Sequence, residues 1–422
     1  MPLPIFIASC GLAAAVLGVM VNVSGVFFTP IAEELGVGRG AVSLTLTITN
    51  LVFALGGMFT PRLVKSRNFK RMLLLSMIVF AGSTALLAIA PNLVLLYLLN
   101  AIRGLAAGVC GTVLVTIVIN NWFYENTSLV TSIAMAFSGI AGAIFSPILS
   151  GIISSVGWRV AYLVNAGLVV LFELPAVLLP IGYFPSDVNY QPYGNKEPSD
   201  TASPAVSKAT DDSDSVPSSS ETSPSAVPFR FPLSLMIPLT IFAVLASYVA
   251  SYPPHFPGVA ESYGLTAAVG SVMLSICMAA NSGGKILFGA LADRFGAKKV
   301  IAILTNVIAL GGLLLLILRV PTGLYVGSAM FGLCYGIGNL GVVTATRELA
   351  GREGYNVVYP TVSMVATIAN AAGSSLVGFM YDAAGNYNSG LILAIALNLI
   401  MVALILFIYA KKKALDSGKV NG

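Results

Sequence analysis

Lys285 is a cationic side chain in the middle of an otherwise apolar segment. A charged group at membrane depth costs roughly 2.5–3.5 kcal/mol on insertion scales, and such groups usually face a water-filled cavity or a partner. In a cavity, the ammonium would form a charge-assisted hydrogen bond with a carboxylate. The sequence therefore predicts that Lys285 binds an organic anion.

A short charged stretch follows Lys285, from Gly289 through Asp293 and Arg294 to Gly296 and Lys299. It marks the turn between two apolar segments, and we expect these residues to act as a gate. Lys285 lies about 12 Å before Asp293 at 1.5 Å per helical residue. The alternative for Lys285 is snorkelling to the membrane surface, which would need nearly its full reach.

Two other ionisable residues lie well inside apolar segments. Arg103 has two open readings: a cavity cation that assists substrate binding or coupling, or a structural group satisfied by carbonyls. Gly104 and Gly108 share its helix face and allow close helix approach. Glu173 fits ion pairing or a helix interface better than substrate contact, although a buried carboxyl can titrate in the physiological range.

Uncharged polar residues complete the candidate substrate site: Tyr252, Tyr335, Asn281 and Asn370. They could line a cavity and bind a carboxylate. Aromatic packing and hydrogen bonds between helices explain them at least as well. His255, the one histidine, lies in a proline-rich loop and predicts neither a metal site nor a proton relay.

The sequence lacks the parts of an enzyme site, since it has one histidine and no paired carboxylates at membrane depth. We expect no catalytic activity, cofactor or metal. Cys10, Cys110, Cys277 and Cys334 lie in apolar runs without metal-ligand spacing, which predicts free thiols in packing positions.

Composition defines the class of protein. The chain has 422 residues, of which 57% are hydrophobic and 9% charged, and its mean hydropathy is +0.89. Soluble proteins average about 25% charged residues. A chain with so few charges is therefore expected to lie mostly within the lipid bilayer. The net charge of +5 is spread in a way that predicts no nucleic-acid binding.

The chain divides into two halves of apolar helices, each spanning helix needing about 20 residues. We predict an all-α membrane protein with an N-terminal six-helix bundle over 1–184, a disordered cytoplasmic linker over 185–230, and a C-terminal six-helix bundle with a short cytoplasmic tail over 231–422. The linker is rich in Ser, Pro and Asp. The twelve predicted spans are 4–29, 40–61, 71–90, 93–120, 128–154, 159–184, 231–253, 265–292, 297–318, 322–346, 355–381 and 389–410.

Lysines and arginines set the predicted orientation. They crowd the turns after the second, eighth and tenth spans and the C-terminal tail, whereas the opposite side carries Arg39, Arg159 and Arg319. The positive-inside rule places both termini and the linker in the cytoplasm. We expect a multi-pass protein of the plasma or inner membrane, acting as a monomer.

The halves also resemble each other in sequence. Residues 101–108 match 329–336, and 57–62 match 289–294. Parallel six-helix repeats joined by a cytoplasmic linker are one plan of secondary transporters.

At these residues the chain resembles the major facilitator superfamily. The superfamily's charged loop motif is intact at 289–299, and Arg103-Gly104 looks like its helix-four arginine motif. The resemblance implies two six-helix, pseudo-symmetric bundles that rock around a central cavity.

Three stretches, at 25–36, 121–123 and 157–159, resemble the oxalate/formate antiporter and monocarboxylate porter branch. In that branch, a basic residue four before the loop glycine contacts the substrate carboxylate, and Lys285 stands there. Asn281 stands where animal-type carriers place an acid, and Asn370 where oxalate-type members carry a second lysine.

We therefore expect a secondary transporter that moves a small organic anion, a monocarboxylate above others, by alternating access. Exchange and coupling to H+ or Na+ both stay open. Two alternatives remain: a proton-coupled exporter of drugs or metabolites, favoured by Arg103, and a non-transporting sensor or scaffold that uses the linker.

Overall fold

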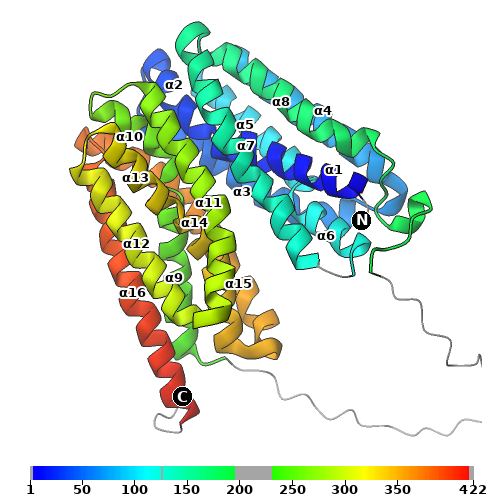
Figure 1. Cartoon of the computed structure of the whole chain (residues 1–422). Helices are drawn as coiled ribbons and strands as arrows, with labels where there is room; N and C mark the ends of the chain where they lie inside the picture. Colours follow the sequence, from blue (N-terminus) through cyan, green and yellow to red (C-terminus); the bar gives the residue numbers. More distant parts are fainter. Residues whose placement is uncertain (1–2, 125–126, 195–230, 418–422) are drawn as a thin grey trace, which may run out of the picture.

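The computed structural model describes residues 3–124, 127–194 and 231–417 (Figure 1). Helices dominate this part of the chain, and its one β-type pairing is an isolated bridge between Phe123 and Tyr193. The first half contains α1 (Leu3–Ala13), η1 (Ala14–Asn22), η2 (Ser24–Phe27), α2 (Phe28–Leu35), α3 (Arg39–Leu63), η3 (Ser66–Asn68), α4 (Phe69–Leu86), η4 (Leu87–Ile89), α5 (Leu93–Val109), α6 (Thr112–Trp122), α7 (Thr127–Val156), α8 (Trp158–Leu178) and η5 (Pro185–Val188).

The second half repeats this all-helical pattern. It contains α9 (Leu233–Ala250), η6 (Pro253–His255), α10 (Phe256–Ser262), α11 (Ala267–Phe295), α12 (Ala297–Ile317), α13 (Pro321–Gly332), α14 (Cys334–Gly336), η7 (Ile337–Gly341), α15 (Val342–Ala384) and α16 (Asn388–Asp416). Within the described residues, eleven helical stretches are long and apolar enough to cross a membrane. A twelfth crossing is assembled from α13, α14, η7 and the start of α15, which turns at Gly351 with a φ of 70°.

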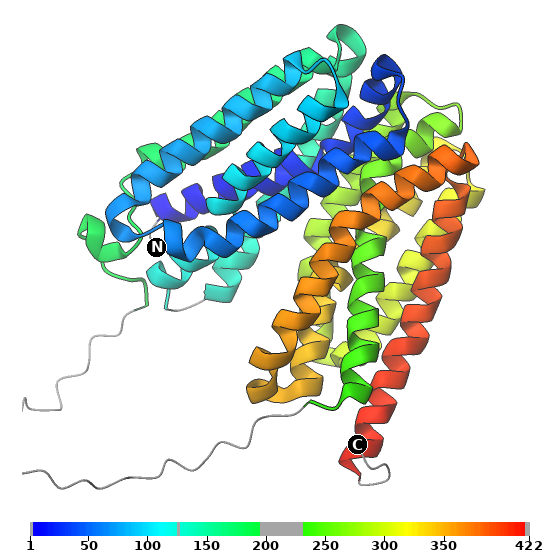
Figure 2. The ribbon, with the colours of Figure 1, turned by 180° about the vertical axis from the view of Figure 1, so that it is seen from behind.

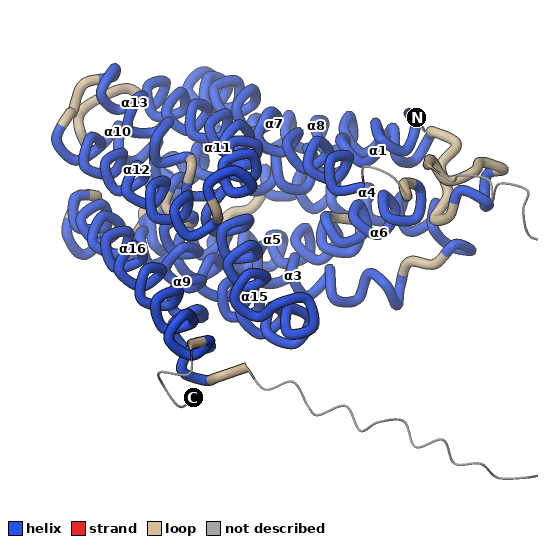
Figure 3. Tube along the Cα trace, turned by 60° about the horizontal axis from the view of Figure 1, so that its bottom comes forward, coloured by secondary structure: helices blue, strands red, loops and turns tan. Residues whose placement is uncertain are grey.

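The helices form two bundles, one from each half, which meet at one end of the molecule and diverge at the other (Figures 1 and 2). Residue 194 leaves the first bundle and residue 231 enters the second at the diverging end, which we call the linker end; the opposite end is the far end. Figure 3 shows helices on every side. Contacts between the bundles run mainly through α3 with α15 and α7 with α11. The observed fold is the predicted all-α, two-bundle arrangement.

Glycines allow α3 and α5 to pack at backbone distance. A Cβ added at Gly108 would lie 3.0 Å from the Cα of Gly56 and would also meet the Phe53 carbonyl oxygen. A Cβ added at Gly104 would lie 2.6 Å from the Thr49 carbonyl oxygen. The small residues of the helix-four pattern therefore set the spacing between these two helices.

We expect Gly108→Ala to lower the melting temperature of the purified protein, because the methyl group must push two backbones apart. Overpacking of this kind costs about 1–3 kcal/mol. Gly82→Ala in α4 is the matched control, since a Cβ there meets nothing within 4 Å. Thermal unfolding in detergent measures both variants. Equal melting temperatures for the two would contradict the packing argument.

Two sequence expectations need correction. His255 was expected in a loop, but it lies in η6, is 1% exposed, and its Nε2 is 2.7 Å from the Ser374 carbonyl oxygen. The first residues of the predicted linker pack on the first bundle: the Tyr193 amide donates to the Trp122 carbonyl oxygen. Residues 195–230, where the remainder of the linker was predicted, lie outside the described residues. The prediction of free, buried cysteines is confirmed for all four.

Candidate functional site

A cavity of about 810 Å³ lies between the two bundles. Its walls come from both halves of the chain, including the wide helical turns η1 and η7, a form of backbone that is common at functional sites. The residues that line it are Leu17, Val21, Asn22, Asn50, Phe53, Ala54, Gly57, Met58, Thr112, Val113 and Ser138 from the first bundle, and Ser247, Ala250, Asn281, Lys285, Tyr335, Gly338, Leu340, Val342, Val343, Tyr359, Ser363, Ala366, Thr367 and Asn370 from the second.

Lys285 lines this cavity from α11, as the sequence led us to expect. It is partly exposed, and it is the one charged residue among the described residues of the wall. Within the described part of the chain, its ammonium has no acidic partner. An ammonium in a water-filled cavity without a fixed counter-charge is available to an anionic ligand.

Three further predicted residues, Asn281, Tyr335 and Asn370, share the cavity wall with Lys285. Asn281 precedes Lys285 by four residues, which places both on one face of α11. The Asn281 side chain is 3% exposed, and its Oδ1 has no hydrogen-bond partner among the described residues. Asn370 donates from Nδ2 to the Ser247 carbonyl oxygen at 3.0 Å, so part of its hydrogen-bonding capacity is already used.

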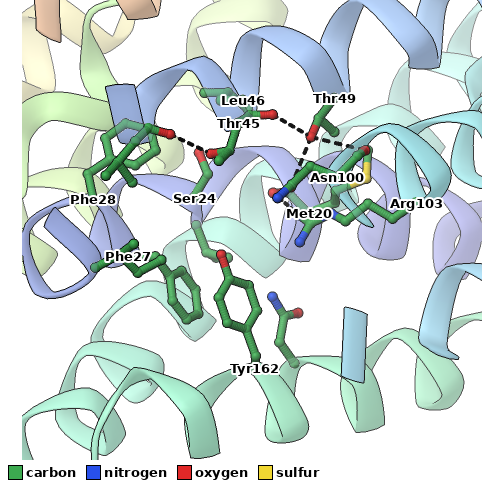
Figure 4. Close-up of a pocket in the computed structure, with 14 residues that line it drawn as sticks. Met20, Ser24, Phe27, Phe28, Thr45, Leu46, Thr49, Asn100, Arg103 and Tyr162 are labelled. Atoms are coloured by element: carbon green, nitrogen blue, oxygen red, sulfur yellow. Dashed lines mark hydrogen bonds between the residues drawn. The ribbon is translucent and has the colours of Figure 1, made fainter. Parts of the chain in front are cut away.

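Arg103 lies outside this cavity. It is 4% exposed and lines a separate, very small pocket inside the first bundle, between α5, α3, η1 and α8 (Figure 4). Its Nη2 donates to the Met20 carbonyl oxygen at 3.1 Å, while Nε and Nη1 have no partner in the described residues. Tyr162 and Asn100 share this pocket. Of the two readings for Arg103, the structural one fits this position, since a carbonyl of a neighbouring segment binds the guanidinium.

Tyr252 also lies away from the cavity. The side chain is fully buried, its hydroxyl donates to the Tyr387 carbonyl oxygen at 3.2 Å, and its ring packs near Phe256 and Phe331. The physical reason is the direction of the chain at the end of α9, where the helix gives way to η6 and the ring turns into the second bundle.

Tyr252→Phe should lower the stability of the protein by about 1 kcal/mol, because it removes one buried hydrogen bond. Ligand affinity should stay within about twofold of the wild-type value, since the ring does not line the cavity. Thermal unfolding and a binding titration on the same sample separate the two effects. A large loss of ligand affinity at unchanged stability would show that Tyr252 takes part in ligand binding.

Sequence reasoning missed several cavity residues, among them Asn50, Phe53 and Ser138. Asn50 carries the same signal as Asn281, an amide inside an apolar span, and could have been found that way. An apolar residue such as Phe53 has no distinguishing signal, because most of its neighbours are apolar too. Glu173 is buried in α8, away from the cavity wall, and its Oε1 has no described partner.

Interactions between the bundles close the far end of the cavity. Asp382 of α15 accepts hydrogen bonds from the backbone amides of Arg39 and Gly40 at 2.8 Å each, which caps the first turn of α3 from the other bundle. The Arg39 guanidinium forms an ion pair with Glu261 at 3.3 Å and lies 4.4 Å from the centre of the Tyr381 ring. We call these five residues the far-end latch.

Further contacts extend this closure along the bundle interface. Thr47 donates from Oγ1 to the Ala371 carbonyl oxygen at 2.6 Å, and Ser275 donates to the Ala143 carbonyl oxygen at 2.6 Å. On α3 the cavity wall begins at Asn50, directly after this contact zone. These contacts therefore close the far end between the bundles, which diverge toward the linker end (Figure 2).

The charged stretch 289–299 lies at the linker end and comprises the end of α11, Gly296 and the start of α12. Gly296 joins the two helices with a φ of 82°, a conformation that favours glycine. Arg294 stacks near Phe295, and the Ala297 amide lies 3.4 Å from the Glu348 carboxylate. A Cβ added at Gly289 would meet no atom within 4 Å. The side chain of Asp293 lies outside the described part of the chain.

Residues 10–256 and 236–421 match the profile of the Major Facilitator Superfamily. A solved structure of a bacterial homolog of the human lysosomal transporter Spinster, inward-facing and occupied, is 14% identical, with coverage of 97% of this chain and 96% of that one and a TM-score of 0.65. A variant of the nucleoside transporter NupG is 14% identical, with 98% coverage of both chains and a TM-score of 0.65.

The same Spinster homolog in an inward-facing, unoccupied form is 15% identical, with coverage of 97% and 94% and a TM-score of 0.61. At such identities the likeness shows the fold alone. No curated protein matches the sequence.

Proposed function

The chain belongs to the major facilitator superfamily and has the fold of a secondary transporter, and we propose that its cargo is a small organic anion, a monocarboxylate above others. The observation that carries this proposal is the position of Lys285, a cation without an acidic partner in the described residues, on the wall of a cavity between two bundles. The resemblance of residues 25–36, 121–123 and 157–159 to the oxalate/formate and monocarboxylate branch supports it.

We propose that the linker end faces the cytoplasm, on the basis of its lysines and arginines. The structure would then be the inward-open state, with the far-end latch closed on the outside. Opening outward would separate Asp382 from the start of α3 and bring the linker ends of the bundles together. The stretch 289–299 lies where that second closure would form, which supports its role as a gate.

The charge on Lys285 also favours exchange. Closing the cavity around an empty ammonium removes its hydration, which is costly without a counter-ion. A bound carboxylate offsets that cost, so the loaded carrier should cross between states more readily than the empty one. Coupling to H+ or Na+ is the alternative way to compensate the same charge.

A counterflow screen in proteoliposomes tests the cargo class. Purified protein is loaded with unlabelled compound, and uptake of the labelled compound is followed for carboxylates, organic cations and neutral nucleosides. We expect uptake of carboxylates alone. Uptake of cations or neutral compounds without carboxylates would favour the exporter, and the absence of flux for every class would favour a sensor or scaffold. Protein-free liposomes give the background.

A further inference from the structure

The two walls of the cavity differ in chemical character. The wall from the first bundle carries no charge, and most of its larger side chains are apolar: Leu17, Val21, Phe53, Met58 and Val113. The wall from the second bundle carries the cation together with hydroxyls and amides: Ser247, Asn281, Lys285, Tyr335, Tyr359, Ser363, Thr367 and Asn370. A ligand that touches both walls therefore meets a cation on one side and, on the other, an uncharged wall whose apolar side chains lie beside the amides of Asn22 and Asn50.

Lys285 and Phe53 lie at a similar distance from the linker end of their helices. Lys285 precedes the end of α11 at Phe295 by as many residues as Phe53 precedes the end of α3 at Leu63. At 1.5 Å per residue, both side chains start about 15 Å from the linker end of their helices. Lys285 and Phe53 thus start at a similar distance from the linker end, on walls from opposite bundles, as a ligand that touches both would need.

The apolar wall is exposed in this state. Met58 is 73% exposed and Val113 is 37% exposed, although both line the cavity. When a ligand covers apolar surface that faces water, the removal of that surface from water favours binding. A cavity of about 810 Å³ is also within the range that holds drug-sized ligands, so a two-carbon acid would leave most of the volume to water.

Building on the proposed function, we propose that the preferred cargo is an amphiphilic monoanion: a single carboxylate that binds Lys285, attached to an apolar body of several carbons that covers the wall of Phe53, Met58 and Val113. A second carboxylate on the wall of the first bundle would have no cationic partner, and burial of an unpaired charge is costly. The cavity therefore selects against dicarboxylates and gives short acids low affinity.

The test uses the full-length protein in nanodiscs and straight-chain acids from acetate to hexanoate, with pentanoate compared against glutarate, the dicarboxylate of equal length. Ligand-induced thermal stabilisation gives the affinities. We expect affinity to rise by about two- to fourfold for each added methylene and glutarate to bind at least about tenfold more weakly than pentanoate. Hexanol and hexylammonium control for partition into lipid.

Two variants assign the effect to the walls. Lys285→Gln should weaken every acid alike, whereas Met58→Gln with Val113→Thr, which keeps side-chain shape, should flatten the dependence on chain length. Met364→Gln with Val357→Thr, the same changes at exposed positions away from the cavity wall, is the matched control and should keep that dependence.

The possible failures are distinct. Acids that bind through Lys285 without any dependence on chain length, or a preference for glutarate, would overturn the amphiphilic cargo and leave the proposed function intact. A chain-length dependence that survives in the Met58→Gln, Val113→Thr variant would overturn the role of this wall. Absence of carboxylate binding to the wild-type protein would overturn the proposed function itself.

Discussion

Replacing Lys285 with glutamine will lower carboxylate transport by about 10- to 150-fold, the factor that corresponds to the 1.5–3 kcal/mol of a hydrogen bond to a charged group. Lys285 is the one charge on the described cavity wall, so no neighbouring cation can take over its role. Glutamine keeps a similar length and a hydrogen-bond donor, which confines the change to the charge. Initial rates of counterflow in proteoliposomes, at matched protein content, measure the effect.

The control for this result is Lys285→Arg, which keeps the charge and should retain a substantial part of the activity. If the glutamine variant transports carboxylates at the wild-type rate, the anion is bound elsewhere and the proposed function fails. If both variants lose activity equally and unfold at a lower temperature, the fold rather than the site has been damaged. Thermal unfolding of each variant separates these outcomes.

A side chain at Gly378 will prevent closure of the far end. A Cβ there would lie 2.6 Å from Ser43 Oγ and 2.7 Å from the Cα of Gly40, so α15 and α3 could not approach as they do. We expect Gly378→Val to reduce transport by at least about tenfold, because a carrier that cannot close on one side cannot alternate. The cavity should then be reachable from the outside.

Cysteine labelling measures that accessibility. Thr367→Cys places a thiol at an exposed position of the cavity wall, and the native cysteines are buried. A membrane-impermeant maleimide applied from outside should label it faster in the Gly378→Val background than in the parent. Gly167→Val is the control, since a Cβ there meets nothing within 4 Å. Unchanged transport together with unchanged labelling would show that this contact does not limit closure.

The fold was predictable because its signal is simple. Long apolar segments between charged turns predicted within a few residues where the spans begin, although the first and seventh continue beyond their predicted ends to Leu35 and Ser262, and an intact loop motif indicated the family. Not every break inside those spans was predictable. The change from α1 to the wide turn η1 depends on packing in three dimensions and leaves no mark on hydropathy, whereas the break after α9 coincides with Pro253 and Pro254.

The candidate site was predictable in part, for a related reason. A polar residue in an apolar helix stands out, so Lys285, Asn281, Tyr335 and Asn370 could be chosen before the cavity was known. Which face of a helix turns toward the cavity is a matter of bundle geometry. An almost uniformly apolar helix gives no periodicity from which to read that face, and the choice for Arg103 between a cavity cation and a structural group therefore stayed open.

The far-end latch also escaped the sequence, since its partners are hundreds of residues apart. Arg39 and Asp382 look like ordinary surface charges when each is viewed in its own segment. The two residues come into contact only because the two bundles meet, and no pattern in the sequence predicts that contact.

The contact between Asp382 and the start of α3 affects the transport cycle. Asp382 supplies to α3 what helices usually obtain from their own preceding residue, a hydrogen-bond acceptor for the first amides. If the far end opens during transport, each cycle breaks the hydrogen bonds between the first amides of α3 and the Asp382 carboxylate. Water then hydrates both groups, and the bonds form again when the far end closes. Such a cap contributes about 1 kcal/mol. The contact is therefore weak enough to break in every cycle, and its geometry still defines how α3 and α15 pack when the far end closes.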